Sequence, residues 1–280
     1  MKIREEVLVP LRRLTVATAS VRYLRGQIEP EMEDQKNPTP SPLRVALVGY
    51  GTMGHEIERL AAERGAQISA TFDLARPIAA NAPIHADVAI EFTHPNAVLG
   101  NIKTLVELGC PVVVGTTGWD RHVDEVRQLV AAAQGRVLYG SNFSVGVNLF
   151  FRIVRAAAQL LNGFPMYDAA LFEAHHNRKA DAPSGTAVTL ASILLEQLDR
   201  KTELCAGNPT GRIDPAALHV SSQRVGAVVG THTVTFDAEA DTIELTHSAR
   251  NRSGFALGAL LAAEWLVGQP PGFYRFEEIF

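Results

Sequence analysis

The sequence predicts an α/β fold, in which a Rossmann-type domain with a parallel sheet is joined to a second α+β domain with a mixed sheet. Two observations predict it. Short apolar strands alternate with amphipathic helices between residues 43 and 139, which is typical of a parallel sheet covered on both faces. Three β-rich runs with short turns between them then follow between residues 219 and 249. At 280 residues the chain can form one large or two medium domains.

Composition excludes several classes of protein. The net charge of -4 gives no reason to expect nucleic acid or membrane binding. No apolar run reaches the roughly 20 residues that span a bilayer. The two cysteines, Cys110 and Cys205, lie far apart and form no metal-type pair, so each is expected to be a small hydrophobic residue in a reducing compartment. We therefore expect a cytoplasmic protein.

Residues 1–42 differ from the rest of the chain and are predicted to be an extension and linker. Acidic residues among the arginines argue against a transit peptide, and no secretory h-region is present. Alternating prolines in 35–42 disfavour helix and sheet. Two interpretations remain open: translation starts at Met32, or residues 1–31 form a loosely docked helix. Because the segment has little apolar area to bury, we expect it to be dispensable.

A strand over 43–48 leads into a glycine-rich turn and then a helix over 56–64. The turn has the pattern G-x-G-x-x-G and consists of Gly49, Tyr50, Gly51, Thr52, Met53 and Gly54. Such glycines permit a tight turn and close approach to a pyrophosphate. The next strand, 67–72, ends at Asp73, about where a ribose 2′-hydroxyl is held in dinucleotide-binding folds.

The rest of the first half continues the alternation. The crossover after Asp73 is too short for a long helix before the strand at 87–92. Predicted next are a helix at 96–108, a strand at 111–114, a helix at 120–133 and a strand at 136–139. Two further loops follow strands, where open α/β sheets bind ligands: Gly115-Thr116-Thr117-Gly118 and Ser141-Asn142-Phe143-Ser144. Two interpretations of Phe143 remain open, a core residue or a residue against a nicotinamide ring.

The second half is predicted to begin with a connecting helix and to end with a tail. The predicted elements are a helix at 145–161, a strand at 166–174, a helix at 187–197, strands at 219–225, 228–237 and 242–249, and a helix at 253–267. The tail, 272–280, carries Phe273, Tyr274, Phe276, Ile279 and Phe280. We expect this apolar tail to pack on the first domain.

The stretch 171–187 concentrates polar chemistry, with two His, one Lys, one Arg and two acids. It ends on Pro183-Ser184-Gly185-Thr186, just before an apolar run, which predicts a helix start. A free helix N-terminus attracts anions. A cationic loop beside it suits a small substrate that carries carboxylates, although a polar loop capped by an ordinary helix is the alternative.

These residues resemble a known family. Glu173-Ala174-His175-His176, Lys179 and Asp181–Ala187 closely resemble the core motif of the 4-hydroxy-tetrahydrodipicolinate reductases (dihydrodipicolinate reductases) of lysine and diaminopimelate synthesis. Gly115–Gly118 and Ser141–Asn148 resemble the family's cofactor loops. The resemblance covers about 43–280. It implies a Rossmann domain over 43–141, completed by 252–280, and a substrate-binding and tetramerising domain over 142–251.

The resemblance also implies hydride transfer from NADH or NADPH to a cyclic imine with two carboxylates. His175 then acts as acid/base and Lys179 as proton donor, while His176, Lys179, Ser184, Gly185 and Thr186 bind substrate carboxylates. The implied cofactor residues are Gly49, Tyr50, Gly51, Thr52, Met53, Gly54, Asp73, Gly115, Thr116, Thr117, Ser141, Asn142 and Phe143. The implied partners are this small substrate and three further copies of the chain, as a homotetramer.

The region after the ribose-binding acid departs from the family pattern. Larger members carry Arg directly after that acid, where this chain has Leu74, and the following segment is shorter. A carboxylate at Asp73 suits a ribose diol and repels a 2′-phosphate, and Arg76 is the nearby cation. We therefore expect NADH to be preferred and NADPH to be usable.

Histidines elsewhere have simpler interpretations. His175 and His176 look like a metal pair, but neighbours on a strand tend to point apart and no third ligand is spaced nearby, so no metal is expected. His176 also fits a satisfied structural histidine. Arg178 is predicted to be a solvated charge, and His232 and His247 to be ordinary half-buried strand residues.

Two rival functions are a different nicotinamide oxidoreductase with the same two-domain plan and a nucleotide sensor without activity. The motif at 173–187 argues against the first rival, because it places anion sites beside acid/base groups. A proton donor, which a sensor does not need, argues against the second.

Overall fold

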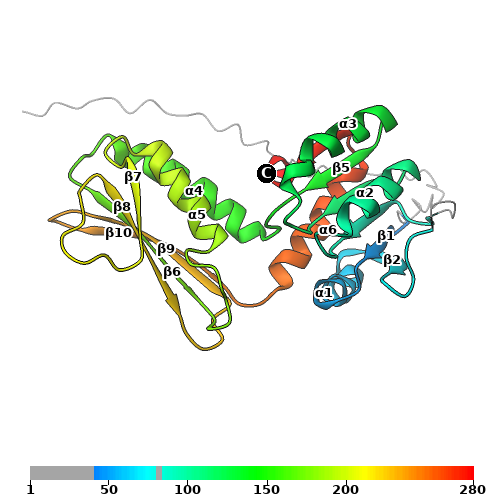
Figure 1. Ribbon diagram of the computed structural model, residues 1–280, viewed down its shortest axis with the longest axis horizontal. Helices are drawn as coiled ribbons and strands as arrows, with labels where there is room; N and C mark the ends of the chain where they lie inside the picture. The colour runs from blue at the N-terminus through cyan, green and yellow to red at the C-terminus, as the bar shows by residue number, and fades with distance from the viewer. Residues whose placement is uncertain (1–40, 80–83) are drawn as a thin grey trace, which may run out of the picture. The chain divides into compact units, whose positions relative to one another are not determined.

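The computed structural model describes residues 41–79 and 84–280 (Figure 1). The predictions for the N-terminal extension, including the alternative start at Met32, lie outside these residues. Within the described part of the chain, no helix is long and apolar enough to cross a membrane.

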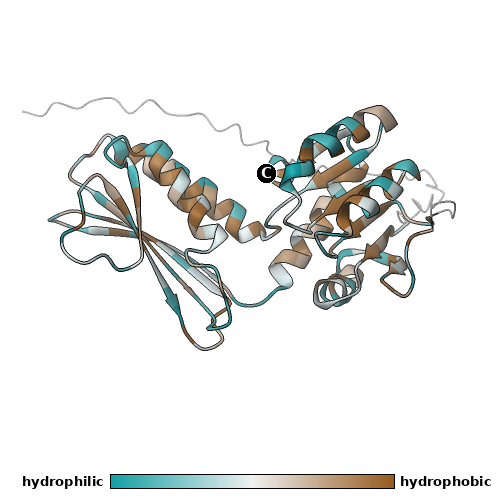
Figure 2. Ribbon diagram, viewed as in Figure 1, coloured by the Kyte–Doolittle hydropathy of each residue, from teal (hydrophilic) through white to brown (hydrophobic). Residues whose placement is uncertain are grey.

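The first sheet contains six parallel strands in the order β11-β5-β4-β3-β1-β2. Its strands are β1 (Leu43–Val48), β2 (Ala66–Phe72), β3 (Val88–Glu91), β4 (Val112–Val114), β5 (Arg136–Tyr139) and β11 (Gly272–Arg275). Figure 2 shows hydrophobic colouring along most of these strands. Continuous apolar strands are typical of a parallel sheet buried on both faces. The predicted Rossmann-type sheet is confirmed.

Helices cover both faces of this sheet. Successive side chains of a strand point to opposite sides, so neighbouring residues belong to different cores. Leu47 of β1 packs with Ile57 in a core that includes α1 (Thr52–Ala61) and α6 (Ser253–Val267). The next residue, Val48, packs on the other face with α2 (Val98–Glu107) and α3 (Val123–Ala133). Short 3-10 turns follow α1 (Ala62–Arg64), precede α3 (Asp120–His122) and end the chain (Phe276–Ile279).

Two features of the first domain differ from the sequence prediction. Helix α1 begins at Thr52, four residues earlier than predicted, since Gly51 serves as its N-cap and the helix therefore starts inside the glycine-rich turn. The C-terminal tail packs on this sheet as predicted, with Phe276 buried, but it does so as a sixth strand beside β5. A four-residue edge strand is too short to give a recognisable pattern.

The second sheet has the order β10-β9-β6-β8-β7 and is mixed, as predicted. Strand β6 lies parallel to β8 and antiparallel to β9. The strands are β6 (Asp168–His175), β7 (Glu203–Ala206), β8 (Ala217–Arg224), β9 (Gly230–Asp237) and β10 (Thr242–Ala249). Strand β7 was not predicted, because its residues are largely exposed at the sheet edge and show no alternation of burial.

One face of the second sheet is covered by α4 (Val145–Asn162) and α5 (Gly185–Gln197), which lie side by side over it (Figure 1). Phe150, Leu190 and Val234 join these helices to the sheet in one core. Among the described residues no helix covers the opposite face, where Phe172 is 38% exposed. The side chains of Glu173, His175 and His232, described below, lie on the covered face.

Candidate active site

The predicted polar stretch forms the end of β6, a loop and the start of α5. Helix α5 begins at Gly185, two residues before the predicted start, and Ser184 is its N-cap. The Ser184 hydroxyl accepts a 3.2 Å hydrogen bond from the Ala187 amide. First-turn amides of a helix have no partner within the helix, so they remain donors for an anion.

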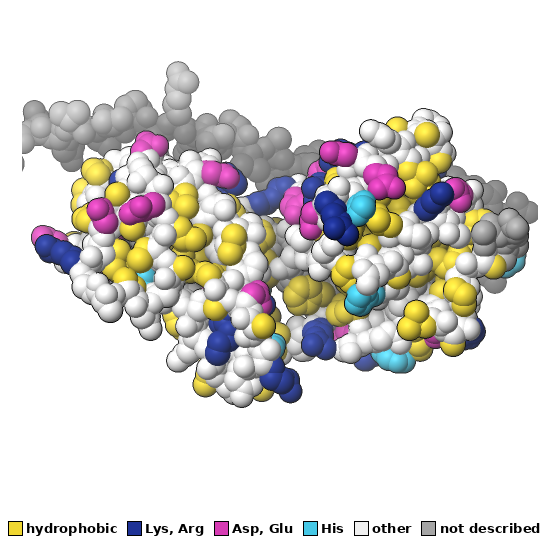
Figure 3. Space-filling view, viewed as in Figure 1, with side chains coloured by type: hydrophobic (Ala, Val, Ile, Leu, Met, Phe, Trp, Pro, Cys, Tyr) yellow, Lys and Arg dark blue, Asp and Glu magenta, His cyan; other side chains and the backbone are white. Residues whose placement is uncertain are grey.

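A cavity of about 980 Å³ opens beside this helix start. It is lined by every substrate residue that the resemblance implies: His175, His176, Lys179, Ser184, Gly185 and Thr186. Thr117, Ser141 and Asn142, from the loops of the first sheet, also line it. A weak 3.4 Å contact joins Asn142 Nδ2 to Thr186 Oγ1. Figure 3 shows Lys and Arg side chains near the loop after β6, which makes this end of the second sheet suitable for an anionic ligand.

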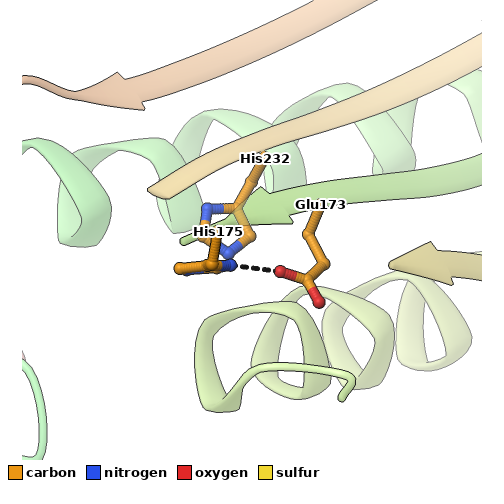
Figure 4. A group of neighbouring side chains, drawn as sticks. All are labelled: Glu173, His175 and His232. Carbon is orange, nitrogen blue, oxygen red and sulfur yellow. Dashed lines mark hydrogen bonds and ion pairs between the residues drawn. The ribbon is translucent and has the colours of Figure 1, made fainter. Parts of the chain in front are cut away.

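Glu173 holds the imidazole of His175. The carboxylate is fully buried, and its Oε2 forms a short hydrogen bond with His175 Nδ1 (Figure 4). Its other oxygen, Oε1, accepts a 2.8 Å hydrogen bond from Arg224 Nη2 and forms an ion pair with it. Burial opposes ionisation of Glu173, but hydrogen bonds from Arg224, Ser222 and His175 outweigh it and hold the pKa of this carboxyl below its usual value. An ionised carboxylate accepts hydrogen bonds only, so Nδ1 of His175 carries a hydrogen.

Burial also governs the proton affinity of His175, which is 8% exposed and lines the cavity. Burial lowers the pKa of this imidazole, and the charge of Glu173 opposes part of that shift. With Nδ1 occupied, Nε2 is the nitrogen left to exchange a proton with a ligand.

The prediction that His232 is an ordinary half-buried residue is wrong. It is 3% exposed, its ring centre lies 5.1 Å from that of His175, and its Nε2 lies 3.1 Å from Ser184 Oγ. Burial lowers the pKa of His232 to about 4. The antiparallel register of β9 on β6 places His232 opposite Glu173, and this long-range pairing cannot be read from either strand alone. His247 is half-buried, as predicted.

The potential metal ligands that lie together are not the adjacent histidines His175 and His176. Ligand atoms of Glu173, His175 and His232 lie within 4.8 Å of one another, so the third group comes from β9 and His176 is not part of it. Arg224 and His175 already occupy both carboxylate oxygens, and Ser184 contacts His232. The arrangement favours a hydrogen-bonded cluster over a cation site.

Lys179 and its loop are fixed by two contacts. Lys179 Nζ lies 2.8 Å from Asp181 Oδ1, and this ammonium lowers the pKa of the Asp181 carboxyl. Arg224 Nη2 donates to the Asp181 carbonyl at 2.5 Å and so ties the loop to β8. Arg224 was not among the predicted site residues. Arg178 is exposed, as predicted, while His176 lines the cavity and its buried Nδ1 has no hydrogen-bond partner among the described residues.

The glycine-rich turn has the geometry that close backbone approach requires. Gly49 has φ +94, and a Cβ there would lie 2.0 Å from the Phe92 carbonyl oxygen, so only glycine fits. Helix α1 begins at Thr52, inside this turn, and no acidic residue lies in the first turn of the helix. Asp73 lies at the end of β2, where its Oδ1 accepts hydrogen bonds from the amides of Ala75 and Arg76, each at 2.9 Å.

The other two loops hold residues of different kinds. Phe143 is 1% exposed and packs against Phe276 and Phe92, which supports the core interpretation. Thr116 is buried and its hydroxyl accepts a 2.7 Å hydrogen bond from the Thr93 amide. Thr117, Ser141 and Asn142 face the cavity, unlike Phe143.

Comparisons with known proteins agree with this fold and site. The family descriptions "Dihydrodipicolinate reductase, N-terminus" and "Dihydrodipicolinate reductase, C-terminus" match residues 43–143 and 146–280. A 4-hydroxy-tetrahydrodipicolinate reductase of Christiangramia forsetii is 39% identical over 239 residues, covering 85% of this chain and 97% of that protein. One from Chromobacterium violaceum is 40% identical over 200 residues, covering 69% and 73%.

Solved structures support the same fold. A dipicolinate-bound dihydrodipicolinate reductase from Paenisporosarcina is 23% identical and has a TM-score of 0.67, covering 85% of this chain and 100% of that one. The amine dehydrogenase of Mycobacterium smegmatis is 12% identical with a TM-score of 0.55, covering 85% of this chain and 96% of that one.

The fold, the glycine-rich turn and the family matches define a nicotinamide-dependent oxidoreductase. More specifically, the chain belongs to the dihydrodipicolinate reductase family, to which its two relatives described above, both 4-hydroxy-tetrahydrodipicolinate reductases, correspond. It is an enzyme of lysine and diaminopimelate biosynthesis.

Proposed function

We propose that the protein reduces 4-hydroxy-tetrahydrodipicolinate to tetrahydrodipicolinate in the cavity beside α5, and that His175 and Lys179 transfer the proton. The observation that carries this proposal is the presence of both side chains in one cavity with the N-terminus of α5. A bound nicotinamide supplies the hydride. Reduction of a conjugated C=N system also needs a proton at the other end of that system, and a positioned His or Lys can deliver it.

Substrate carboxylates are assigned to the first turn of α5 and its surroundings. Gly185 and Thr186 line the cavity in the first turn of α5, and a helix N-terminus favours negative charge. Ser184 supports that turn as the N-cap. His176 and Lys179 add side-chain donors from the loop.

NADH is assigned as the preferred cofactor and NADPH as usable. The glycine-rich turn and the loops at Gly115–Thr117 and Ser141–Asn142 hold it, with Asp73 on the ribose. Leu74 is an exposed apolar residue that offers no charge to a 2′-phosphate. Arg76 lies three residues after Asp73, and its Nη2 makes a 3.4 Å contact to Thr71 Oγ1.

The protein is assigned to the cytoplasm. It is also assigned as a homotetramer whose subunits meet at the uncovered face of the second sheet. Phe172 is exposed there, and paired hydroxyls of Thr233 with Thr246 and of Thr231 with Ser248 extend across the same face. In this assignment 142–251 bind substrate and form the subunit contacts, while 43–141 with 252–280 bind the cofactor. The molar mass in solution, measured by light scattering, tests the tetramer, and Phe172→Glu is expected to dissociate it.

The substitution His175→Ala tests the proposed chemistry. Loss of a general acid–base group typically lowers turnover by about 10²- to 10⁴-fold, and NADH affinity is expected to stay near wild type because the cofactor loops are untouched. His85→Ala, at an exposed histidine, is the matched control. Near-normal turnover of His175→Ala would overturn the assignment. A panel of cyclic imines and hydroxy acids separates this activity from that of other nicotinamide dehydrogenases.

A further inference from the structure

The carboxylate of Glu173 is costly to bury, and it lies directly beside the imidazole of His175. Glu173 and His175 are two residues apart on β6, so both point to the face covered by α4 and α5. Glu173 is fully buried, and each oxygen has one charged or chargeable partner, Arg224 or His175. A buried charge needs pairing, and an apolar residue would fill this core position without that requirement.

The ring of His175 is confined on its other side by β9. A Cβ on Gly230 would lie 2.9 Å from His175 Nε2 and 3.2 Å from Cδ2, so the absence of a side chain there leaves room for the ring. The φ of Gly230 is not in the left-handed region, and space rather than backbone conformation is therefore the constraint. His232 packs against the same ring at an interplanar angle of 73°. Glu173, Gly230 and His232 together hold one orientation of the imidazole.

We propose that Glu173, anchored by Arg224, is the positioning residue for His175: it keeps the hydrogen on Nδ1 and thereby makes Nε2 the atom that transfers the proton. This inference rests on the proposed role of His175 as acid/base. In the step itself, Nε2–H breaks as the proton passes to the substrate atom that gains the electron pair, and the ring returns to the neutral Nδ1–H tautomer. Glu173 keeps its charge throughout and accepts the same hydrogen bond before and after.

The charged groups around His175 explain why this one carboxylate matters. Lys179 from the loop and Arg224 from β8 are cations that disfavour the positively charged form of the His175 ring, and burial acts in the same direction. His232 from β9 is held neutral by burial, with its pKa at about 4. Asp181 is paired with Lys179. Glu173 therefore supplies the anion in direct contact with the imidazolium that must form.

The substitution Glu173→Gln tests the proposal in the full chain. Arg224 attracts the amide oxygen of the new side chain, which turns its NH₂ group toward Nδ1 and selects the other tautomer of His175. We expect kcat to fall about 10²- to 10⁴-fold while the KM for substrate and the affinity for NADH change little. Without the carboxylate the pKa of His175 falls further, so the falling limb of the pH–rate profile moves to lower pH.

Two further variants separate positioning from a structural role. Glu203→Gln removes a charge from an exposed residue that does not line the cavity, and its kcat and pH profile are expected to remain those of wild type. Glu173→Asp keeps the charge but shortens its reach, so it should show reduced kcat with little movement of the pH limb. This variant also tests the proposal where Glu173→Gln fails to fold, and wild-type turnover of Glu173→Asp would then overturn it.

The double variant His175→Ala/Glu173→Gln distinguishes this inference from the proposed function. If Glu173 acts through His175, the double variant turns over no more slowly than His175→Ala. A folded Glu173→Gln with normal kcat, or with reduced kcat and an unmoved pH limb, overturns the positioning role while leaving the proposed function intact. Normal turnover of His175→Ala overturns the proposed function itself.

Discussion

Ser184 Oγ lies 3.1 Å from Nε2 of the buried His232, and the same oxygen caps helix α5 by accepting from the Ala187 amide. One hydroxyl thus joins the N-terminus of α5 to strand β9. The helix start that we assign to substrate carboxylates and the strand beside the His175 ring are therefore connected through a single side chain.

Substitution Ser184→Ala is expected to destabilise the protein and weaken substrate binding. Loss of an N-cap costs about 1 kcal/mol, and leaving a buried polar group without its partner costs about 1–3 kcal/mol more. Ser144→Ala is the matched control, since Ser144 caps α4 by accepting from the Val147 amide without contacting His232. Urea unfolding of both variants measures the difference. Equal losses of unfolding free energy would show that the His232 contact contributes nothing.

Stability is expected to depend on the protonation of His232. Its pKa is lowered from 6.5 to about 4 by burial, so the unfolded chain binds a proton more readily than the folded protein between these values. The contribution of neutral His232 is thus complete above pH 6.5 and is lost as the pH falls toward 4, by up to about 3 kcal/mol. Unfolding free energies of wild type and His232→Gln, measured from pH 7 to pH 4, should show a flatter dependence in the variant. His85→Gln serves as the exposed control, and parallel curves for wild type and His232→Gln would contradict this account.

Lys179 is expected to matter to the reaction far more than its partner Asp181. Lys179→Ala removes both a hydrogen-bond donor to the substrate carboxylates and a proton donor. We therefore expect KM to rise and kcat to fall by about 10²- to 10⁴-fold. Asp181→Asn breaks a partly exposed ion pair worth about 0–1 kcal/mol and preserves the backbone carbonyl that Arg224 contacts, so kcat should change less than about tenfold. Steady-state kinetics on both variants and on the exposed control Arg178→Ala measure this. Comparable losses for Lys179→Ala and Asp181→Asn would refute it.

Sequence information sufficed wherever the signal was local. The strand, glycine turn and helix around Gly49 were recognisable because each part constrains its neighbours in sequence, and the bounds of α6 were predicted without error. The residues between His175 and Thr186 come together because one loop and one helix start carry all of them. The family resemblance carried by this local motif therefore named residues that the structure places along one cavity.

Long-range pairing explains what the sequence did not predict. Arg224 meets Glu173 across 51 residues, and His232 meets Ser184 across 48. The first contact depends on the pairing of β6 with β8, and the second on the packing of the α5 N-terminus against β9, and no single strand encodes either. Strand β7 and strand β11 pair at sheet edges over four residues each, too few for their alternation to be distinctive.

The turn after β2 provides the last prediction, which concerns cofactor choice. Asp73 uses Oδ1 for the amides of Ala75 and Arg76, and Asp73→Asn can preserve these bonds through its own side-chain oxygen while removing the charge. Because a carboxylate suits a ribose diol and repels a 2′-phosphate, wild type should be more efficient with NADH. The Asn variant should lose about tenfold of that preference, and Leu74→Arg should raise efficiency with NADPH. Values of kcat/KM with both cofactors decide this, and Arg76→Ala reports whether Arg76 assists NADPH. A clear NADPH advantage in wild type would refute the assignment.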